Sequence, residues 1–140
     1  MTRLLINIVA VMTIALSVNA QEGDPVFVKH KELMAKKPDI QGKNVRVWNI
    51  KKTDIIRINL VEMSGELGLH KHPDAEHSLL VLKGKVRVKV GDKFVVMKKG
   101  DFISIPKDVP HKYWSLSKKS LLVSMDAPYY DPKKTVRLEN

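Results

Sequence analysis

The amino-acid sequence predicts an all-β protein, a small barrel or sandwich made of many short strands. From Asn44 onward, short apolar runs are separated by Gly, Pro, Asp and Lys at nearly regular spacing, a pattern typical of antiparallel barrels and sandwiches. Within the segment 85–90, valines alternate with lysine and arginine, which indicates a strand with one buried and one exposed face. No helical periodicity of useful length interrupts these runs after Asn44.

The N-terminal segment 1–20 has the composition of a secretory signal peptide. Arg3 is followed by a short apolar run, and Val18 and Ala20 then occupy the positions that signal peptidase reads. The apolar run is too short to span a bilayer comfortably. We therefore expect cleavage after Ala20 and a periplasmic or secreted protein without stable membrane insertion. A retained N-terminal anchor is the alternative.

The chain is 140 residues long, has a formal net charge of +10 and contains no cysteine. This length suits one domain with a single hydrophobic core. Cleavage after residue 20 removes one basic residue, Arg3, and leaves 24 basic against 15 acidic residues. The lack of cysteine excludes cysteine nucleophiles and thiolate ligands, so we expect nitrogen and oxygen atoms to hold any metal.

Residues 21–43 are expected to form an N-terminal arm ahead of the barrel. Asp24 and Pro25 suit the start of a short helix, because proline fits the first helical position, and Pro38 ends it. His30 lies in this arm, far in sequence from the other histidines. We expect it to be an ordinary surface residue.

Nine strands are predicted in the barrel segment 44–126, each bounded by turn residues. Their ranges are 44–50, 55–62, 67–72, 77–82, 85–90, 94–97, 102–105, 111–116 and 120–126. In the tail, 127–140, prolines flank Tyr129 and Tyr130, which predicts a stiff segment unable to extend a sheet. We expect these tyrosines to pack on the barrel, with a lid over its mouth as the alternative.

Basic residues concentrate in the segment 83–99. They could form a patch for anionic glycans or membrane headgroups. The simpler interpretation is a solvated face and a charged strand edge that discourages aggregation. An exported protein does not meet the usual nucleic-acid partners, so we expect no nucleic acid to bind. We expect a small-molecule ligand or substrate instead.

Four histidines are the candidate functional residues. His70 and His72 are two residues apart, so both point to the same face of an extended strand. The turn residues 73–76 return the chain as a second strand that begins with His77. His111 follows downstream. Neutral imidazoles gathered in this way are typical ligands of divalent transition metals.

The histidine segments resemble the two sequence motifs of the cupin superfamily. The first family motif is a His-x-His pair, three or four residues, a third ligand, six residues and a glycine. This chain matches it with His70-Lys71-His72, four residues, His77, six residues and Gly84.

The second family motif is a glycine, five residues, Pro-x-Gly, two residues, a histidine and, after three more residues, an asparagine, whose place Ser115 takes in this chain. Here it corresponds to Gly100, five residues, Pro106-Lys107-Asp108, two residues and His111. Asp108 stands where the family has its second glycine. It can adopt the left-handed turn conformation that the glycine would supply.

The third ligand of the first motif is usually Glu in the family, and this chain offers both Glu76 and His77. Counting back from Gly84 favours His77, whereas Glu76 would leave seven residues before the glycine. His77 also shares its strand face with Leu79 and Val81, and Glu76 lies on the other face. We expect His77 to be the ligand. Glu76 is then expected either to contact the ligands without binding the metal or to be exposed.

The resemblance implies a double-stranded β-barrel, or jelly roll, over residues 44–126, and one divalent transition metal, either Zn, Cu, Ni, Fe or Mn. Its ligands would be His70, His72, His77 and His111. A protein exported unfolded acquires its metal outside the cytoplasm, where affinity would favour Cu, Ni or Zn. The resemblance also implies a homodimer, joined through an edge strand or the arm, for which the segment Asn44–Ile50 with Trp48 is the candidate.

Two kinds of metal-dependent chemistry fit such a site. The first is dioxygenase-type chemistry on an enol or diol, which the resemblance to quercetinase-like cupins implies. The second is Lewis-acid catalysis by a lyase or isomerase of a carboxylate or sugar acid. For this mode Tyr113, which shares the inward face of His111, is the candidate acid or base, and Arg57 can bind a substrate carboxylate. A non-catalytic metal- or sugar-binding module is the third candidate.

Overall fold

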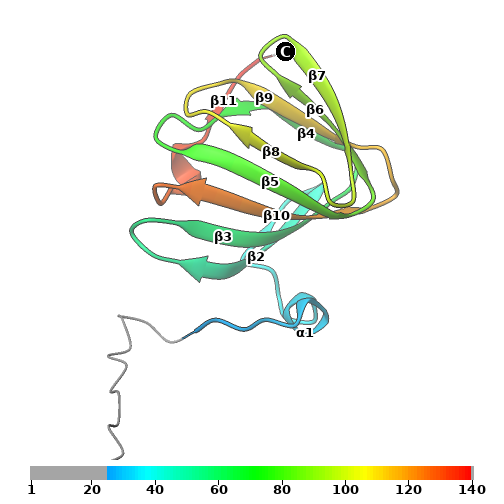
Figure 1. The fold of residues 1–140 in the computed structure, drawn as a ribbon, viewed down its shortest axis with the longest axis vertical. Helices are drawn as coiled ribbons and strands as arrows, with labels where there is room; N and C mark the ends of the chain where they lie inside the picture. The colour runs from blue at the N-terminus through cyan, green and yellow to red at the C-terminus, as the bar shows by residue number, and fades with distance from the viewer. Residues whose placement is uncertain (1–24, 140) are drawn as a thin grey trace, which may run out of the picture.

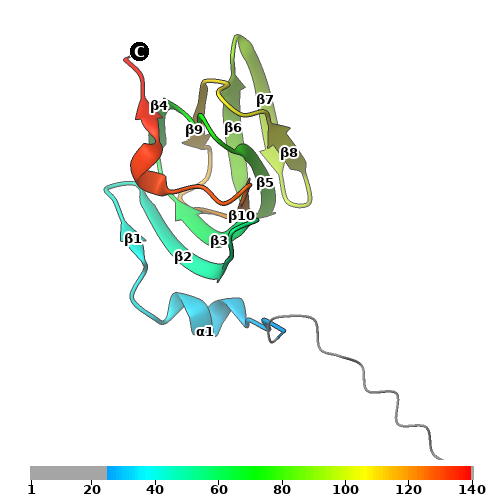
Figure 2. The same ribbon diagram turned by 90° about the vertical axis from the view of Figure 1, so that its left-hand side faces the viewer.

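The computed structural model describes residues 25–139, which form two antiparallel sheets that face each other (Figures 1 and 2). One sheet has six strands in the order β1-β2-β3-β10-β5-β8, and the other has five in the order β11-β4-β9-β6-β7. The predicted all-β barrel is therefore confirmed. The proposed signal segment 1–20 lies outside the described residues.

The elements run in chain order as α1 (His30–Met34), β1 (Ile40–Gln41), β2 (Val45–Lys52), β3 (Arg57–Met63), β4 (Glu66–Lys71), β5 (Glu76–Lys83), β6 (Lys85–Val90), β7 (Lys93–Lys98), β8 (Phe102–Ile105), β9 (His111–Ser115), β10 (Ser120–Ala127), the 3-10 helix η1 (Pro132–Lys134) and β11 (Val136–Arg137). Each of the nine predicted strands is present, with ends shifted by at most two residues. Two short strands, β1 and β11, were not predicted. Among residues 25–139, no helix is long and apolar enough to cross a membrane.

The end of the tail contains a short strand that was not predicted. The segment with the two tyrosines does not join a sheet, as expected from its prolines, but β11 pairs with β4 and extends the five-stranded sheet. The prediction concerned the proline-flanked segment 127–132, and the pairing of Val136 and Arg137 was not foreseen. These two residues follow the last proline, Pro132, and have N–H groups that can pair.

The N-terminal arm packs on the outer face of the six-stranded sheet. Its helix begins at His30, five residues later than Pro25, where it was expected. Trp48 of β2 is 1% exposed, and its indole N–H donates to the carbonyl of Lys36 at 2.9 Å. The arm lies beside β2 (Figure 2), and because Trp48 is buried and bonded to the arm, its ring is not available to a second subunit. The homodimer itself stays a prediction.

The apolar core lies between the inner faces of the two sheets. It contains Met63, Leu79, Val81, Val86, Val88, Met97, Ile105, Tyr113 and Leu122. Val86 and Val88 are fully buried while Arg87 between them is exposed, which confirms the alternation expected for the segment 85–90. Each such buried valine or leucine contributes roughly 1.5–3 kcal/mol of transfer free energy. Buried polar side chains, among them Arg57, His77 and Asp126, adjoin this core and line one cavity with Leu79 and Leu122.

Candidate metal centre

The strand register brings the histidines to one end of the barrel. His70 lies near the end of β4, directly opposite His111 at the start of β9. His77 lies near the start of β5, and its neighbour across the sheet is Asp126, near the end of β10. Directly opposite residues of antiparallel strands present their side chains to the same face. Imidazoles from both sheets therefore meet inside the barrel.

The four rings form a cluster. The ring centroids of His70 and His111 are 4.4 Å apart, as are those of His72 and His77, and His72 lies 5.1 Å from His111. The possible ligand atoms of His70, His72 and His111 lie within 4.8 Å of one another. His77 belongs to a second group of the same spacing, with His72 and Asp126. The predicted ligands are thus gathered in two groups that share His72, not in one group of four.

Hydrogen bonds orient His70 and His111. The Nδ1 of His70 is 2.7 Å from the carbonyl oxygen of Gly68, and that of His111 is 2.8 Å from the carbonyl oxygen of Val109. A carbonyl only accepts, so Nδ1 carries the hydrogen in both rings. Nε2 of each neutral ring then keeps its lone pair free. This is the arrangement in which protein histidines bind metals.

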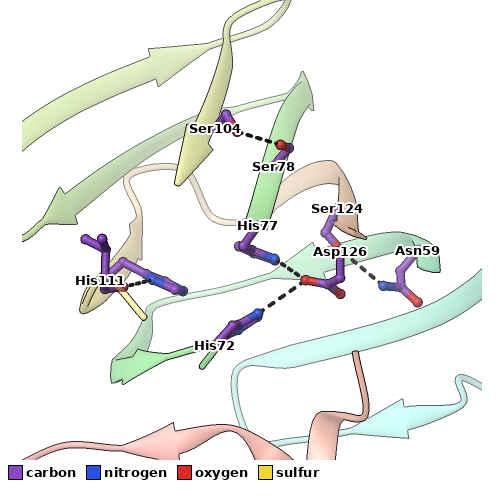
Figure 3. Close-up of polar contacts among 9 residues, drawn as sticks. Asn59, His72, His77, Ser78, Ser104, His111, Ser124 and Asp126 are labelled. Atoms are coloured by element: carbon purple, nitrogen blue, oxygen red, sulfur yellow. Dashed lines mark hydrogen bonds and ion pairs between the residues drawn. The ribbon is translucent and has the colours of Figure 1, made fainter. Parts of the chain in front are cut away.

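The carboxylate of Asp126 orients the other two rings. Its Oδ1 lies 2.6 Å from Nδ1 of His77 and 3.2 Å from Nδ1 of His72 (Figure 3). Asp126 was not among the residues predicted for the site. Its signal was an acidic side chain at an inward position of a strand whose other inward residues are Ser120, Leu122 and Ser124.

Burial favours the neutral form of three imidazoles, those of His70, His77 and His111. Desolvation lowers the pKa of His70 to about 4, against the partial effect of its bond to Gly68. Desolvation and the neighbouring imidazoles lower the pKa of His111 to about 2, and burial also lowers that of His77. For Asp126, burial alone would raise the pKa, but the hydrogen bonds from His72 and His77 outweigh it and lower the value. The site thus combines neutral nitrogen donors with one ionised carboxylate.

The chemistry of this donor set fits a divalent transition metal. Nε2 of His111 is buried and has no hydrogen-bond partner among residues 25–139. Buried polar atoms are normally paired, so an orphaned lone pair among other nitrogen donors suits a cation. In a bound state, imidazole ligands would come from His70, His72, His77 and His111. Asp126 would accept hydrogen bonds from the Nδ1 atoms of two of these rings and so fix their orientation.

Tyr113 and Arg57, the predicted catalytic and substrate-binding residues, both line the cavity of the histidines, which has a volume of about 140 Å³. Tyr113 is 4% exposed, and its hydroxyl has no hydrogen-bond partner in the described part of the chain. Burial, with a smaller effect of the charge on Asp126, raises its pKa well above 10. Arg57 is 7% exposed and donates from Nε to Oδ1 of Asn49 at 3.1 Å.

Glu76 lies outside the histidine cluster. It is exposed at the first position of β5, where its carboxylate accepts a hydrogen bond from the hydroxyl of Ser104. His77, the next residue, is buried. The predicted difference between the two strand faces is confirmed, while the role of His77 as a ligand stays a prediction.

Two segments contact His72 and restrict its position. Asp108 has a φ of 63°, the predicted left-handed conformation, and its N–H donates to the carbonyl of His72 at 2.7 Å. Tyr130 from the tail stacks on the His72 ring, with centroids 4.6 Å apart and planes 6° apart. Tyr130 is 2% exposed. This tyrosine therefore packs on the barrel, as expected, whereas its contact with His72 was not foreseen.

Comparison with known proteins agrees with this architecture. Residues 59–125 match the family model of the cupin domain. The chain is 30% identical over 115 residues to an uncharacterised protein of Aquifex aeolicus, which covers 82% of this chain and 95% of that protein. It is also 35% identical over 69 residues to quercetin 2,3-dioxygenase of Bacillus subtilis, covering 46% of this chain and 20% of that enzyme.

Among solved structures, KdgF from Halomonas sp. superposes with a TM-score of 0.70 at 17% sequence identity. The superposition covers 79% of this chain and 99% of KdgF. At this identity the likeness concerns the fold. Together with the two histidine motifs and the matching family model, it shows that the chain belongs to the cupin superfamily.

Proposed function

We propose that this protein is an exported cupin that binds one divalent transition metal through His70, His72, His77 and His111, and that it acts as an enzyme on a small oxygenated organic molecule. One observation carries the proposal. Each of the four Nδ1 atoms lies within 3.2 Å of an oxygen acceptor, which leaves the four Nε2 atoms as ligands. Such outer hydrogen bonds accompany metal-binding histidines almost always.

The metal would supply either activation of O₂ or Lewis-acid polarisation of a substrate oxygen. The chain's own residues would bind and orient the substrate. Arg57 presents a buried positive charge to the cavity, and Tyr113 presents a hydroxyl that keeps its proton because its pKa is raised by burial. Apolar walls such as Val61 and Leu122 exclude water from the same space.

Dioxygenase-type chemistry is the first candidate reaction. The similarity to quercetin 2,3-dioxygenase supports it, although that similarity spans a fifth of the dioxygenase. The cavity of about 140 Å³ limits the size of the substrate, because sites for drug-sized ligands have volumes of roughly 300–1,000 Å³. We therefore expect a small enol or diol, or a larger molecule of which only the reacting end enters.

A lyase or isomerase of a carboxylate or sugar acid is the second candidate. The observation that favours it is the presence of a proton-bearing hydroxyl and a guanidinium in one cavity, from Tyr113 and Arg57. The first could donate a proton, and the second could bind a carboxylate.

The test begins with protein purified from the compartment to which it is exported. Its bound metal is measured by mass spectrometry, and the N-terminus of the mature chain, expected at Gln21, is sequenced. Enediols, flavonols and uronates are then screened with and without O₂. Turnover coupled to O₂ uptake supports a dioxygenase, and anaerobic turnover supports a lyase or isomerase. Tightly held metal without any turnover would indicate a binding module and contradict the enzymatic proposal.

A further inference from the structure

The tail carries a guanidinium group to the edge of the candidate metal centre. After Ala127 the chain passes from the six-stranded to the five-stranded sheet (Figure 2), where β11 pairs with β4. Arg137 then lies directly opposite His70, and the N–H of Leu138 donates to the carbonyl of Leu69 at 3.0 Å. Directly opposite residues share a face of the sheet, so Arg137 lies on the side of the sheet that His70 faces.

A groove of about 460 Å³ adjoins the histidine cavity at this edge. Val45, Val47 and Leu67 line both the groove and the cavity, and so does His70. Arg137 is the one cationic side chain among the described residues of the groove lining. A molecule in this groove would therefore contact apolar walls, a candidate metal ligand and a single permanent positive charge.

Arg137 has no internal counter-charge in the described chain. Two other cations near this edge are paired, Lys71 with Asp108 at 2.7 Å and Lys134 with Asp74 at 3.5 Å. Arg137 forms no such pair and no side-chain hydrogen bond within residues 25–139. Its planar fork of N–H donors is available to an outside acceptor, and this fork matches the two oxygens of a carboxylate.

We propose that Arg137 binds the carboxylate of a small organic acid that approaches the histidine cluster along this groove. The proposal rests on the proposed function and names its substrate class. A carboxylate monoanion matches one guanidinium, whereas a phosphate monoester carries a charge of roughly −1.5 to −2. Arg57 is buried on the facing sheet and lines the adjoining histidine cavity, not the groove, so the groove itself offers one permanent positive charge.

The experiment compares two pairs of probes that differ in the carboxylate, lactate with propylene glycol and glucuronate with glucose. Binding is measured by calorimetry and ligand-observed NMR on the zinc-loaded protein and, in parallel, on the metal-free protein. The variants are Arg137→Gln, Arg137→Lys and Arg87→Gln. The last is the matched control, because it removes the same charge from an exposed residue of β6 that does not line the groove. Zinc content is measured on every sample.

We expect the wild type to prefer the acid of at least one pair, and Arg137→Gln to weaken that binding by about fivefold or more, since one charge-assisted contact is lost. Arg137→Lys should keep part of the affinity, and Arg87→Gln should match the wild type. Added salt should weaken binding to the wild type more than to Arg137→Gln.

Equal or no binding of acid and neutral probe by the wild type would overturn the proposal, as would equal effects of Arg137→Gln and Arg87→Gln. If the same samples retain zinc, these results would not contradict the proposed metal centre. Conversely, wild-type protein that binds acids through Arg137 but holds neither zinc nor any other divalent transition metal would refute the proposed function and keep the carboxylate site.

Discussion

The carboxylate of Asp126 lies 2.6 Å from Nδ1 of His77, and these two residues are neighbours on adjacent strands, 49 positions apart in the sequence. The same oxygen accepts a second hydrogen bond, from His72. One ionised side chain therefore sets the orientation of two candidate ligands. A substitution of Asp126 therefore tests the orientation of both candidate ligands at once.

Asp126→Asn should lower metal affinity by roughly 10–100-fold, the range known for outer-shell partners of metal-binding histidines. The amide oxygen is uncharged, so it accepts more weakly than the carboxylate oxygen that receives both Nδ1–H groups, and the two rings are oriented less firmly. The measurement is competition with a chelator of known affinity. Ser124→Ala is the control, since Ser124 is a buried neighbour on β10 that bonds to Asn59 at 3.1 Å and to none of the histidines. Equal affinity of Asp126→Asn and wild type would contradict the assigned role.

Alanine at any one of His70, His72, His77 or His111 should lower metal occupancy. The loss should be at least as large as that of an outer-shell substitution, because a ligand is removed. Bound metal per chain, measured after dialysis, is the readout.

Two controls belong to that series. His30→Ala removes an exposed imidazole of α1 and should leave occupancy unchanged. Glu76→Ala should also retain most of the metal, because Glu76 points away from the cluster. If Glu76→Ala strips the metal and His77→Ala does not, the third ligand is misassigned. Full occupancy in all four histidine variants would place the metal elsewhere.

The metal-free protein should lose stability as the pH falls below about 6.5, the ordinary pKa of histidine. His70 and His111 have pKa values lowered to about 4 and about 2 in the folded state. Between these values and 6.5 the unfolded chain binds more protons than the folded one, so acid favours unfolding. Above about pH 6.5 these imidazoles are neutral in both the folded and the unfolded chain, so they no longer make the free energy of unfolding depend on pH.

Urea unfolding with a chelator present, at several pH values between 7.5 and 4.5, measures this dependence. A His111→Gln variant should show a shallower loss over the same range, because one of the depressed groups is gone. A free energy of unfolding that stays constant or rises toward acid pH would show that the folded state does not hold these imidazoles neutral.

Tyr113→Phe should abolish most turnover while retaining the metal, if the hydroxyl donates a proton to the substrate. Removal of a positioned proton donor costs typically about 10²–10⁴-fold in rate. Stability should be unchanged or higher, because the buried hydroxyl has no hydrogen-bond partner among residues 25–139. Tyr129→Phe, whose ring lies 4.8 Å from Nζ of Lys52, is the control. Equal turnover in the two variants would assign Tyr113 to packing alone.

Tyr130→Ala should destabilise the protein by about 3–5 kcal/mol, as removal of a large buried aromatic ring does. It should also weaken metal binding, because the ring stacks on His72 at 4.6 Å. Tyr130→Phe keeps the stacking and should behave like the wild type in both assays.

Truncation before Pro128, which also removes β11, should lower metal content and stability together. A truncation that changed only substrate affinity would make the tail a lid.

Much of the fold followed from patterns within a few residues. The alternation over 85–90 and the turn residues placed all nine predicted strands, because strand period and turn conformation depend on local side chains. The same parity separated the buried His77 from the exposed Glu76. The left-handed conformation of Asp108 was predicted from its place in a motif.

The tertiary structure decided which distant residues complete the site. Asp126 meets His72 across 54 positions of sequence, Tyr130 stacks on that same ring, and β11 sets Arg137 opposite His70. No local pattern specifies such contacts, because they depend on strand pairing and barrel closure. The sequence by itself thus determined the strands, the motifs and the candidate ligands, and closure of the barrel decided what orients those ligands and which charge lies at their edge.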